Sequence, residues 1–208
     1  MKIRAILFDM DGVLIEAKEW HYEALNRALE LFGLQISRFD HLTMFNGLPT
    51  RRKLEILTLE RGLQQELHFF INELKQKYTM ELICTKCRPL FAHEYALSKL
   101  KANGYLVAVC SNSIRQTVDA MMERANLAQY LDFVVSNSEV VQGKPSPEMY
   151  QKAMAFFNVD PAECLIVEDN ENGIRAAKAA GGNLLVVRDV TEVNLANIMA
   201  RVAEVEPH

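Results

Sequence analysis

The sequence predicts an α/β protein with a doubly wound parallel sheet, a Rossmann-like core, and an inserted all-helical cap. Short runs of consecutive apolar residues recur along the chain, as in strands that helices cover on both faces. Segments with apolar residues at helical spacing separate these runs, and alternation of strand and helix predicts a parallel sheet. One long interval after the first run holds helical patterns without a strand-like run, which predicts the insert.

Five apolar runs are predicted strands. The first covers residues 3–8 and ends at Asp-Met-Asp-Gly. The others cover residues 106–110, 133–135, 164–167 and 184–187. In such sheets ligands bind beyond the carboxyl ends of the strands, so the polar residues that follow these runs are the candidates for a functional site.

Helical spacing of apolar residues predicts the elements between the strands. In the core the repeats are Val118, Met121, Met122 and Ala125, then Met149, Ala153, Phe156 and Phe157; in the insert they begin with Leu25, Ala28, Leu29 and Phe32. We therefore predict an α/β catalytic core of residues 1–15 and 81–208 and a helical cap domain of residues 16–80. Because the cap follows the first strand directly, we expect it to lie over the carboxyl edge of the sheet as a lid.

Composition and charge argue against several classes of function. Half of the 208 residues are hydrophobic, which suits one buried core plus a smaller unit. The formal net charge of −4 argues against nucleic-acid and membrane-surface partners, which usually require a basic excess. No apolar run approaches the roughly 20 residues that span a bilayer, and no signal-peptide pattern opens the sequence. We expect an unprocessed cytoplasmic protein that is a monomer.

The four cysteines are predicted to be reduced. Cys110 and Cys164 lie in apolar runs, where a thiol behaves as a small buried hydrophobe. Cys84 and Cys87 have the C-x-x-C spacing of a zinc half-site or a redox pair, but no second pair completes it. Ordinary thiols in a connecting segment are therefore the favoured interpretation.

Polar residues after the predicted strands converge on one edge of the sheet. They are Asp9 and Asp11, Ser111 and Asn112, Glu168 and Asp169, joined by Lys144 from the 143–147 loop. Crowded carboxylates repel unless a cation lies among them, and oxygen-only ligands select a hard ion such as Mg²⁺. A serine and a lysine beside such a cluster indicate a phosphoryl group, whose oxygens need a hydrogen-bond donor and a positive charge.

Each of these motifs has a purely structural alternative when taken alone. Asp-x-Asp-Gly after a strand is also a common turn, and Glu168-Asp-Asn also suits a helix start. Ser111 could be a cap, and Lys144 a solvated loop lysine. The occurrence of all four in order, each after a strand or in the loop that follows one, favours the site.

These motifs resemble the haloacid dehalogenase superfamily, and within it the β-phosphoglucomutase-like phosphatases and mutases. The matching segments are Asp9-Met-Asp-Gly-Val-Leu14, Ser111 with Asn112, Lys144-Pro-Ser-Pro147 and Glu168-Asp-Asn-Glu-Asn-Gly173. The resemblance spans essentially the whole chain. It implies a magnesium-dependent hydrolase, a phosphatase, that forms an aspartyl-phosphate.

The resemblance also implies a role for each residue. Asp9 would be the nucleophile and Asp11 the general acid and base. Ser111 would hydrogen-bond the phosphoryl group, and Lys144 would neutralise its charge and orient the nucleophile. Asn112 would shape the loop beside the substrate.

The resemblance implies a metal centre and a substrate-reading cap as well. Mg²⁺ would bind the carboxylates of Asp9 and Asp169 and the main-chain carbonyl of Asp11, with Glu168 supporting directly or through water. In the cap, the residues that resemble substrate-contacting positions are His21, Gly47, Arg51 and Arg52.

The sequence favours hydrolysis of a small phosphorylated metabolite, a sugar or polyol phosphate, over a phosphosugar mutase. The sequence departs from the family it resembles at three places. Ala17 stands at the first cap hinge, where close relatives often carry a polar residue, and Phe91-Ala92 stands where a Pro-Gly pair is common. The spacing from Gly47 to Arg51 is one residue longer than in the mutases. A dehalogenase would need neither the second aspartate nor the metal carboxylates. A binding protein on a retired enzyme scaffold would lack a catalytic group, and here none is lost.

Overall fold

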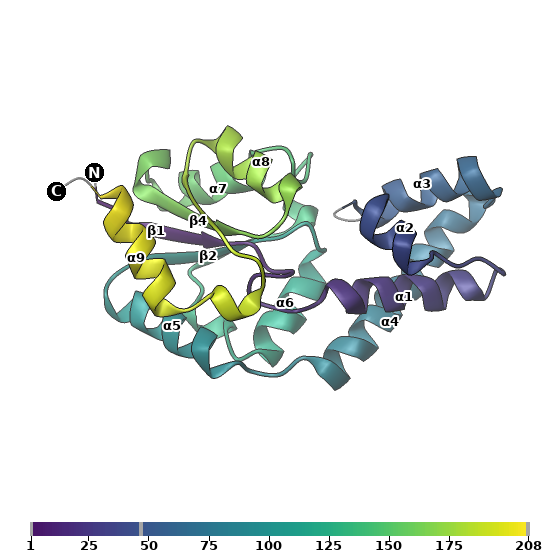
Figure 1. Ribbon diagram of the computed structural model, residues 1–208, viewed down its shortest axis with the longest axis horizontal. Coiled ribbons are helices and arrows are strands. Elements are labelled where there is room, and N and C mark those ends of the chain that lie inside the picture. The colour runs from purple at the N-terminus through teal and green to yellow at the C-terminus, as the bar shows by residue number, and fades with distance from the viewer. Residues whose placement is uncertain (1, 46–47, 207–208) are drawn as a thin grey trace. The chain divides into compact units, whose positions relative to one another are not determined.

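The computed structural model describes residues 2–45 and 48–206, and the chain divides into two compact units (Figure 1). The core unit comprises Met1–Glu16 and Cys87–His208, and the helical unit comprises Ala17–Lys86. The sequence-based boundary after residue 80 falls inside a helix, α4 (His68–Lys86). The inserted segment is therefore six residues longer at this end than its apolar pattern indicates, because that pattern does not mark where α4 ends.

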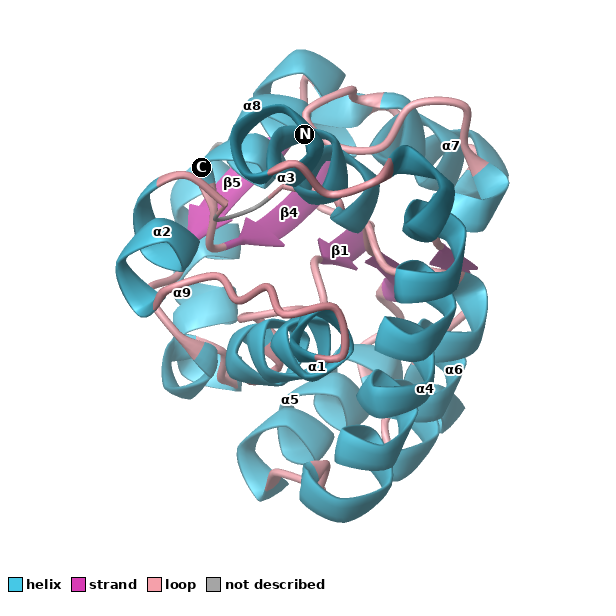
Figure 2. Ribbon diagram, turned by 90° about the vertical axis from the view of Figure 1, so that its right-hand side faces the viewer, coloured by secondary structure: helices cyan, strands magenta, loops and turns pink. Residues whose placement is uncertain are grey.

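The core unit holds a parallel sheet, which confirms the predicted fold class. Within the described residues its strands are β1 (Ala5–Phe8), β2 (Leu106–Cys110), β3 (Phe133–Val135), β4 (Cys164–Glu168) and β5 (Asn183–Val186). Their order is β3-β2-β1-β4-β5, and every neighbouring pair is parallel. The strands are the magenta arrows of Figure 2.

Helices cover both faces of this sheet. They are α5 (Phe91–Ala102), α6 (Arg115–Arg124), α7 (Glu148–Phe157), α8 (Glu171–Ala180) and α9 (Leu195–Val205). In Figure 1, α7 and α8 lie on one face, and α5 and α9 pack together on the other. Two covered faces explain why β1 and residues 164–167 of β4 are consecutive apolar residues, and why both strands are buried along their whole length.

The strand register brings the polar residues to one edge. Phe8, the last residue of β1, pairs with Val109 and with Val167. Asp9 continues the ladder, because its N–H donates to the carbonyl of Val167 at 3.0 Å. Ser111 continues β2 in the same way, with its N–H on the carbonyl of Val135 at 2.9 Å.

The helical unit is built from α1 (Lys18–Glu30), α2 (Arg38–Thr43), α3 (Thr50–Arg61) and α4. Its own hydrophobic core consists of Leu25, Ala28, Leu29, Ile36, Phe45, Leu54, Leu57, Leu63 and Ile71. The side-chain amide of Asn26 fixes the segment after α1, because it accepts from the N–H of Ile36 at 2.8 Å and donates to the carbonyl of Ile36 at 2.9 Å. This self-contained core makes the insert a folded unit in its own right.

None of the helices in the described part of the chain is long and apolar enough to cross a membrane. No disulfide joins the four cysteines. Burial raises the pKa of Cys110 and of Cys164 to about 12, so both thiols are protonated and unreactive. Among the residues described, the groups of side chains that could hold a metal do not include Cys84 or Cys87.

Candidate active site

The candidate site is a buried charge cluster at the carboxyl ends of β1 and β4. Asp9 follows β1, and Glu168 is the last residue of β4; they are 5% and 0% exposed. Lys144, 5% exposed, reaches them from the loop before α7. Its Nζ donates to Asp9 Oδ1 and to Glu168 Oε1, each at 2.6 Å. The lysine thereby joins the two strand ends through one buried cation.

Burial dominates the electrostatics of this cluster. It raises the pKa of Asp9 well above its ordinary value, against the opposing charge of Lys144, and the nearby Glu168 and Asp11 carboxylates raise it further. Burial alone would lower the pKa of Lys144, but the carboxylates of Asp9 and Glu168 outweigh burial, and the net shift is upward. The lysine therefore keeps its proton and its positive charge.

Tyr150 is a member of the cluster that the sequence interpretation missed. Its hydroxyl donates to Glu168 Oε1 at 2.5 Å, and Lys144 Nζ lies 4.8 Å from the centroid of its ring. The pKa of Tyr150 is well above its usual value because of burial and the nearby carboxylates, so the hydroxyl keeps its proton and donates. The sequence held one signal for Tyr150, which is its position among the buried apolar residues of α7. A buried tyrosine hydroxyl requires a hydrogen-bond partner, which would have pointed to a nearby polar group.

Asn112 holds the main chain of Lys144. Its Oδ1 accepts from the N–H of Lys144 at 2.9 Å, and its Nδ2 donates to the carbonyl of the same residue at 3.2 Å. These two bonds agree with a loop-shaping role for Asn112; its contact with substrate stays a prediction.

Asp11 and Ser111 are linked through Ser113. Ser113 Oγ donates to Asp11 Oδ2 at 3.0 Å, and the N–H of Ser113 donates to Ser111 Oγ at 3.1 Å. The turn that presents Asp11 requires Gly12, whose φ of 96° lies in the left-handed region. Ser113 therefore connects two of the predicted catalytic residues.

The residues at this edge fit a divalent cation. Carboxylate oxygens of Asp9, Glu168 and Asp169 all lie within 4.8 Å of one another. Three carboxylates face one lysine, so a positive ion would relieve their repulsion, and an all-oxygen donor set suits a hard cation. The carboxylate of Asp11 is outside this group. Metal binding by the main-chain carbonyl of Asp11 stays a prediction.

Gly173 allows α8 to begin directly beside Glu168. A Cβ added to Gly173 would lie 1.9 Å from Glu168 Oε1. We expect Gly173→Ala to lower the free energy of unfolding by about 1–3 kcal/mol, because donors on both oxygens fix the Glu168 carboxylate, so that it cannot move away. Replacing glycine by alanine inside a helix usually raises the free energy of unfolding, so the expected change is opposite in sign to the usual one. Urea denaturation measures the change.

The matched control is Lys178→Ala, at an exposed position of the same helix, which should change stability by less than about 0.5 kcal/mol. A Gly173→Ala protein as stable as the wild type would contradict the described packing of Glu168.

The predicted substrate-binding residues of the helical unit are in different environments. His21 Nδ1 lies 3.3 Å from Lys75 Nζ. Arg51 and Arg52 are exposed, and both form ion pairs with Glu55. Gly47 lies outside the described residues. The structure thus pairs His21 with a lysine and directs both arginines to an acid on their own helix.

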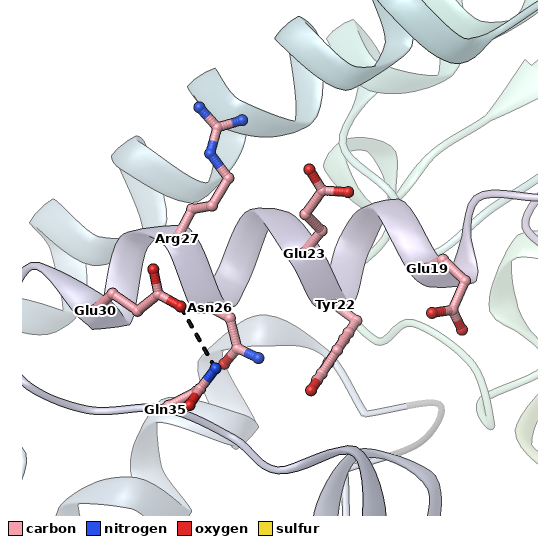
Figure 3. A pocket seen from close by; sticks show the side chains of 7 residues that line it. All are labelled: Glu19, Tyr22, Glu23, Asn26, Arg27, Glu30 and Gln35. Carbon is pink, nitrogen blue, oxygen red and sulfur yellow. Dashed lines mark hydrogen bonds between the residues drawn. The ribbon is translucent and has the colours of Figure 1, made fainter.

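The helical unit also carries an open hollow of about 330 Å³ along α1 (Figure 3). It is lined by Glu19, Tyr22, Glu23, Asn26, Arg27, Glu30 and Gln35. Gln35 Nε2 donates to Glu30 Oε1 at 3.5 Å across it. Its glutamates outnumber its one arginine, so this hollow lacks the positive charge that a phosphate ester requires.

Comparison with known proteins agrees with this chemistry. The model of the haloacid dehalogenase-like hydrolase family matches residues 6–187. A phosphorylated carbohydrates phosphatase of Thermotoga maritima is 30% identical over 86% of this chain and 82% of that protein. A phosphoglycolate phosphatase of Aquifex aeolicus is also 30% identical, with the same coverage of both chains.

A solved structure of β-phosphoglucomutase from Clostridium difficile shares the fold. It has a TM-score of 0.82 at 22% identity and covers 97% of this chain and 98% of that one. The fold and the superfamily predicted from the motifs are confirmed. The chain belongs to the haloacid dehalogenase-like hydrolases, as an enzyme of their phosphatase type.

Proposed function

We propose that this protein is a magnesium-dependent phosphatase that hydrolyses a small phosphorylated metabolite, a sugar or polyol phosphate, through an aspartyl-phosphate on Asp9. The observation that carries the proposal is the buried Asp9 carboxylate, held by Lys144 at 2.6 Å within a cluster of three carboxylates. The similarity to a phosphatase of phosphorylated carbohydrates supports the substrate class.

The residues of the cluster divide the reaction into two displacements. A carboxylate oxygen of Asp9 attacks phosphorus, and the bond to the ester oxygen breaks as Asp11 donates its proton to that oxygen. Asp11 then takes a proton from water, which attacks phosphorus and releases inorganic phosphate and Asp9. Ser113, bonded to Asp11 Oδ2 at 3.0 Å, keeps the Asp11 carboxyl in place through both steps.

Lys144 and Ser111 serve the transferring group. Lys144 fixes the direction of the Asp9 carboxylate and supplies positive charge, and Ser111 is placed to hydrogen-bond phosphoryl oxygens. Mg²⁺, when held by Asp9, Asp169 and the Asp11 carbonyl with support from Glu168, would neutralise charge on those oxygens.

Ala17 favours hydrolysis over isomerisation of a phosphosugar. It is the residue before α1, it is buried, and its side chain offers no cap hydrogen bond. A mutase must protect its phospho-enzyme from water until a second hydroxyl arrives. This protection requires cap closure to be coupled to protonation of Asp11. Ala17, at the first cap hinge, has no side-chain hydrogen bond that could provide this coupling. The mutase is therefore the second candidate.

The proposal places the enzyme in the cytoplasm, as a monomer. Four cysteines without a disulfide are usual in a reducing compartment.

Removal of divalent metal is expected to abolish phosphate release, and Mg²⁺ should restore it. The measurement is phosphate release over a panel of phosphorylated sugars and polyols, in excess chelator and after addition of Mg²⁺. Zn²⁺ should not substitute well, because it prefers nitrogen and sulfur ligands in tetrahedral geometry. Full activity in chelator would contradict the metal assignment.

A second assay separates the two candidates. The enzyme is given a hexose 1-phosphate with a catalytic amount of hexose bisphosphate, and free phosphate and hexose 6-phosphate are both followed. Formation of the isomer much faster than phosphate release would establish the mutase and leave the role of Asp9 intact.

A further inference from the structure

Tyr150 lies in the first turn of α7, and its side chain is completely buried. It follows Lys144 by six residues, so one segment of the chain brings a hydroxyl and a cation to the last residue of β4. Both donate to the same oxygen, Glu168 Oε1: the hydroxyl at 2.5 Å and the lysine Nζ at 2.6 Å. The hydroxyl of Tyr150 is a group of the buried cluster that the proposed mechanism does not use.

Two carboxylates compete for the ammonium of Lys144. Its Nζ lies 2.6 Å from Asp9 Oδ1 and 2.6 Å from Glu168 Oε1, so the two acids hold it at equal distance. Glu168 is the more deeply buried of the two, at 0% against 5% exposure, and opposite charges attract more strongly where water is excluded. Without another influence, Glu168 would draw the cation away from Asp9.

Other donors to Glu168 reduce its hold on Lys144. The N–H of Asp169 donates to Oε2 at 3.1 Å, and the hydroxyl of Tyr150 donates to Oε1. Each donor draws on the single negative charge that the carboxylate carries, so less of it remains for the lysine. Of these two donors, Tyr150 shares the oxygen that binds Lys144 and therefore competes with the lysine directly.

We propose that Tyr150 is a positioning residue, which keeps Lys144 bonded to Asp9 by donating to the oxygen with which Glu168 holds the lysine. The inference rests on the proposed phosphatase function and adds a residue that does not touch the substrate. Its effect belongs to the transition state, in which Lys144 must orient the nucleophile and stabilise the transferring phosphoryl group. All four side chains belong to the core unit.

Tyr150→Phe removes the hydroxyl and keeps the ring, whose centroid lies 4.8 Å from Lys144 Nζ. On the best ester of the wild type, we expect kcat to fall about tenfold and KM to stay within about twofold, because the lost bond acts on the transferring group and not on substrate binding. The assay is run well below the melting temperature of the variant, so that all of the protein is folded.

The control is Tyr95→Phe, which removes the hydroxyl of an exposed tyrosine on α5. It should change neither kcat nor KM. A kcat of Tyr150→Phe within about twofold of the wild type would overturn the inference, because the hydroxyl would then only fill its place in the core.

A second measurement follows the nucleophile without turnover. Beryllium fluoride, in the presence of Mg²⁺, bonds to a carboxylate oxygen and gives an adduct with the shape and charge of an aspartyl-phosphate, which fluorine NMR detects. The adduct should form on the wild-type protein and be absent from Asp9→Asn. We expect Tyr150→Phe to weaken its formation about tenfold and Tyr95→Phe to leave it unchanged.

A double variant shows whether Tyr150 acts through Glu168. In Glu168→Gln the neutral amide no longer competes for Lys144, so adding Tyr150→Phe should change the affinity for beryllium fluoride by less than about twofold. A hydroxyl with a purely structural role would cause the same loss with and without Glu168→Gln. Equal losses in the two backgrounds would therefore overturn the inference.

The two readouts keep this inference distinct from the proposed function. If none of the esters is hydrolysed while the adduct forms, the proposed function fails, and the adduct decides the inference. If esters are hydrolysed and Tyr150→Phe leaves kcat unchanged, the inference alone fails. The absence of the adduct from the wild-type protein would also overturn it, since Asp9 would then not be the nucleophile that Lys144 orients.

Discussion

Asp9→Asn is expected to abolish turnover, with kcat at least about four orders of magnitude below the wild type. An amide oxygen cannot form the covalent intermediate, so the loss should exceed that from any residue that only stabilises charge. The variant should fold, because Lys144 keeps its bond to Glu168 at 2.6 Å. Phosphate release on the best substrate measures the effect, and a thermal melt verifies the fold.

The control for Asp9→Asn is Asp119→Asn. Asp119 is half-exposed on α6 and pairs with Arg115, outside the buried cluster. Its replacement should leave turnover within a factor of about two. If the Asp9→Asn protein kept more than about a tenth of wild-type activity, the nucleophile assignment would be wrong.

Lys144→Met is expected to lower the free energy of unfolding by about 3–5 kcal/mol in metal-free buffer and to abolish activity. The substitution leaves Asp9 and Glu168 buried at 5% and 0% exposure without the cation that joins them. Urea denaturation measures stability, and Lys152→Met, an exposed position on α7, is the matched control with less than about 0.5 kcal/mol of change.

A double variant separates the electrostatic cause from lost packing. Adding Glu168→Gln to Lys144→Met removes one of the two stranded negative charges, so part of the stability should return while activity stays lost. No recovery in the double variant, or a loss below about 1 kcal/mol in the single one, would show that the ion pairs contribute little to stability.

The sheet and its polar edge could be predicted because their signal is local. Residues 5–8 and 164–167 are consecutive apolar residues followed by acids, and parallel pairing then brings Asp9 and Glu168 to the same end. The predicted first strand is longer than β1, which begins at Ala5. The hydrophobic core extends beyond the hydrogen-bonded part of the sheet, so residues that precede a strand can also be apolar. Ile3, for example, lies before β1 and is 1% exposed.

The orientation of single side chains could not be predicted in this way. Arg51 and Arg52 were predicted to contact substrate because they are positively charged. On α3, however, both are exposed, whereas Leu54 and Leu57 are buried and form the interior face of the helix. Lys53 lies four residues before Leu57 and shares that face. Its burial depends on packing with other helices, and the sequence pattern around it does not specify that packing.

The pairing of β1 also affects the order in which the protein forms during its synthesis. Ala5 pairs with Leu106 and with Cys164, so β1 waits on the ribosome for partners that are translated much later. The helical unit lies entirely within Ala17–Lys86 and has its own apolar interior, so it can complete its fold during that interval. The apolar β1 is exposed until β2 arrives, and this is the stage at which the nascent chain is most vulnerable to aggregation.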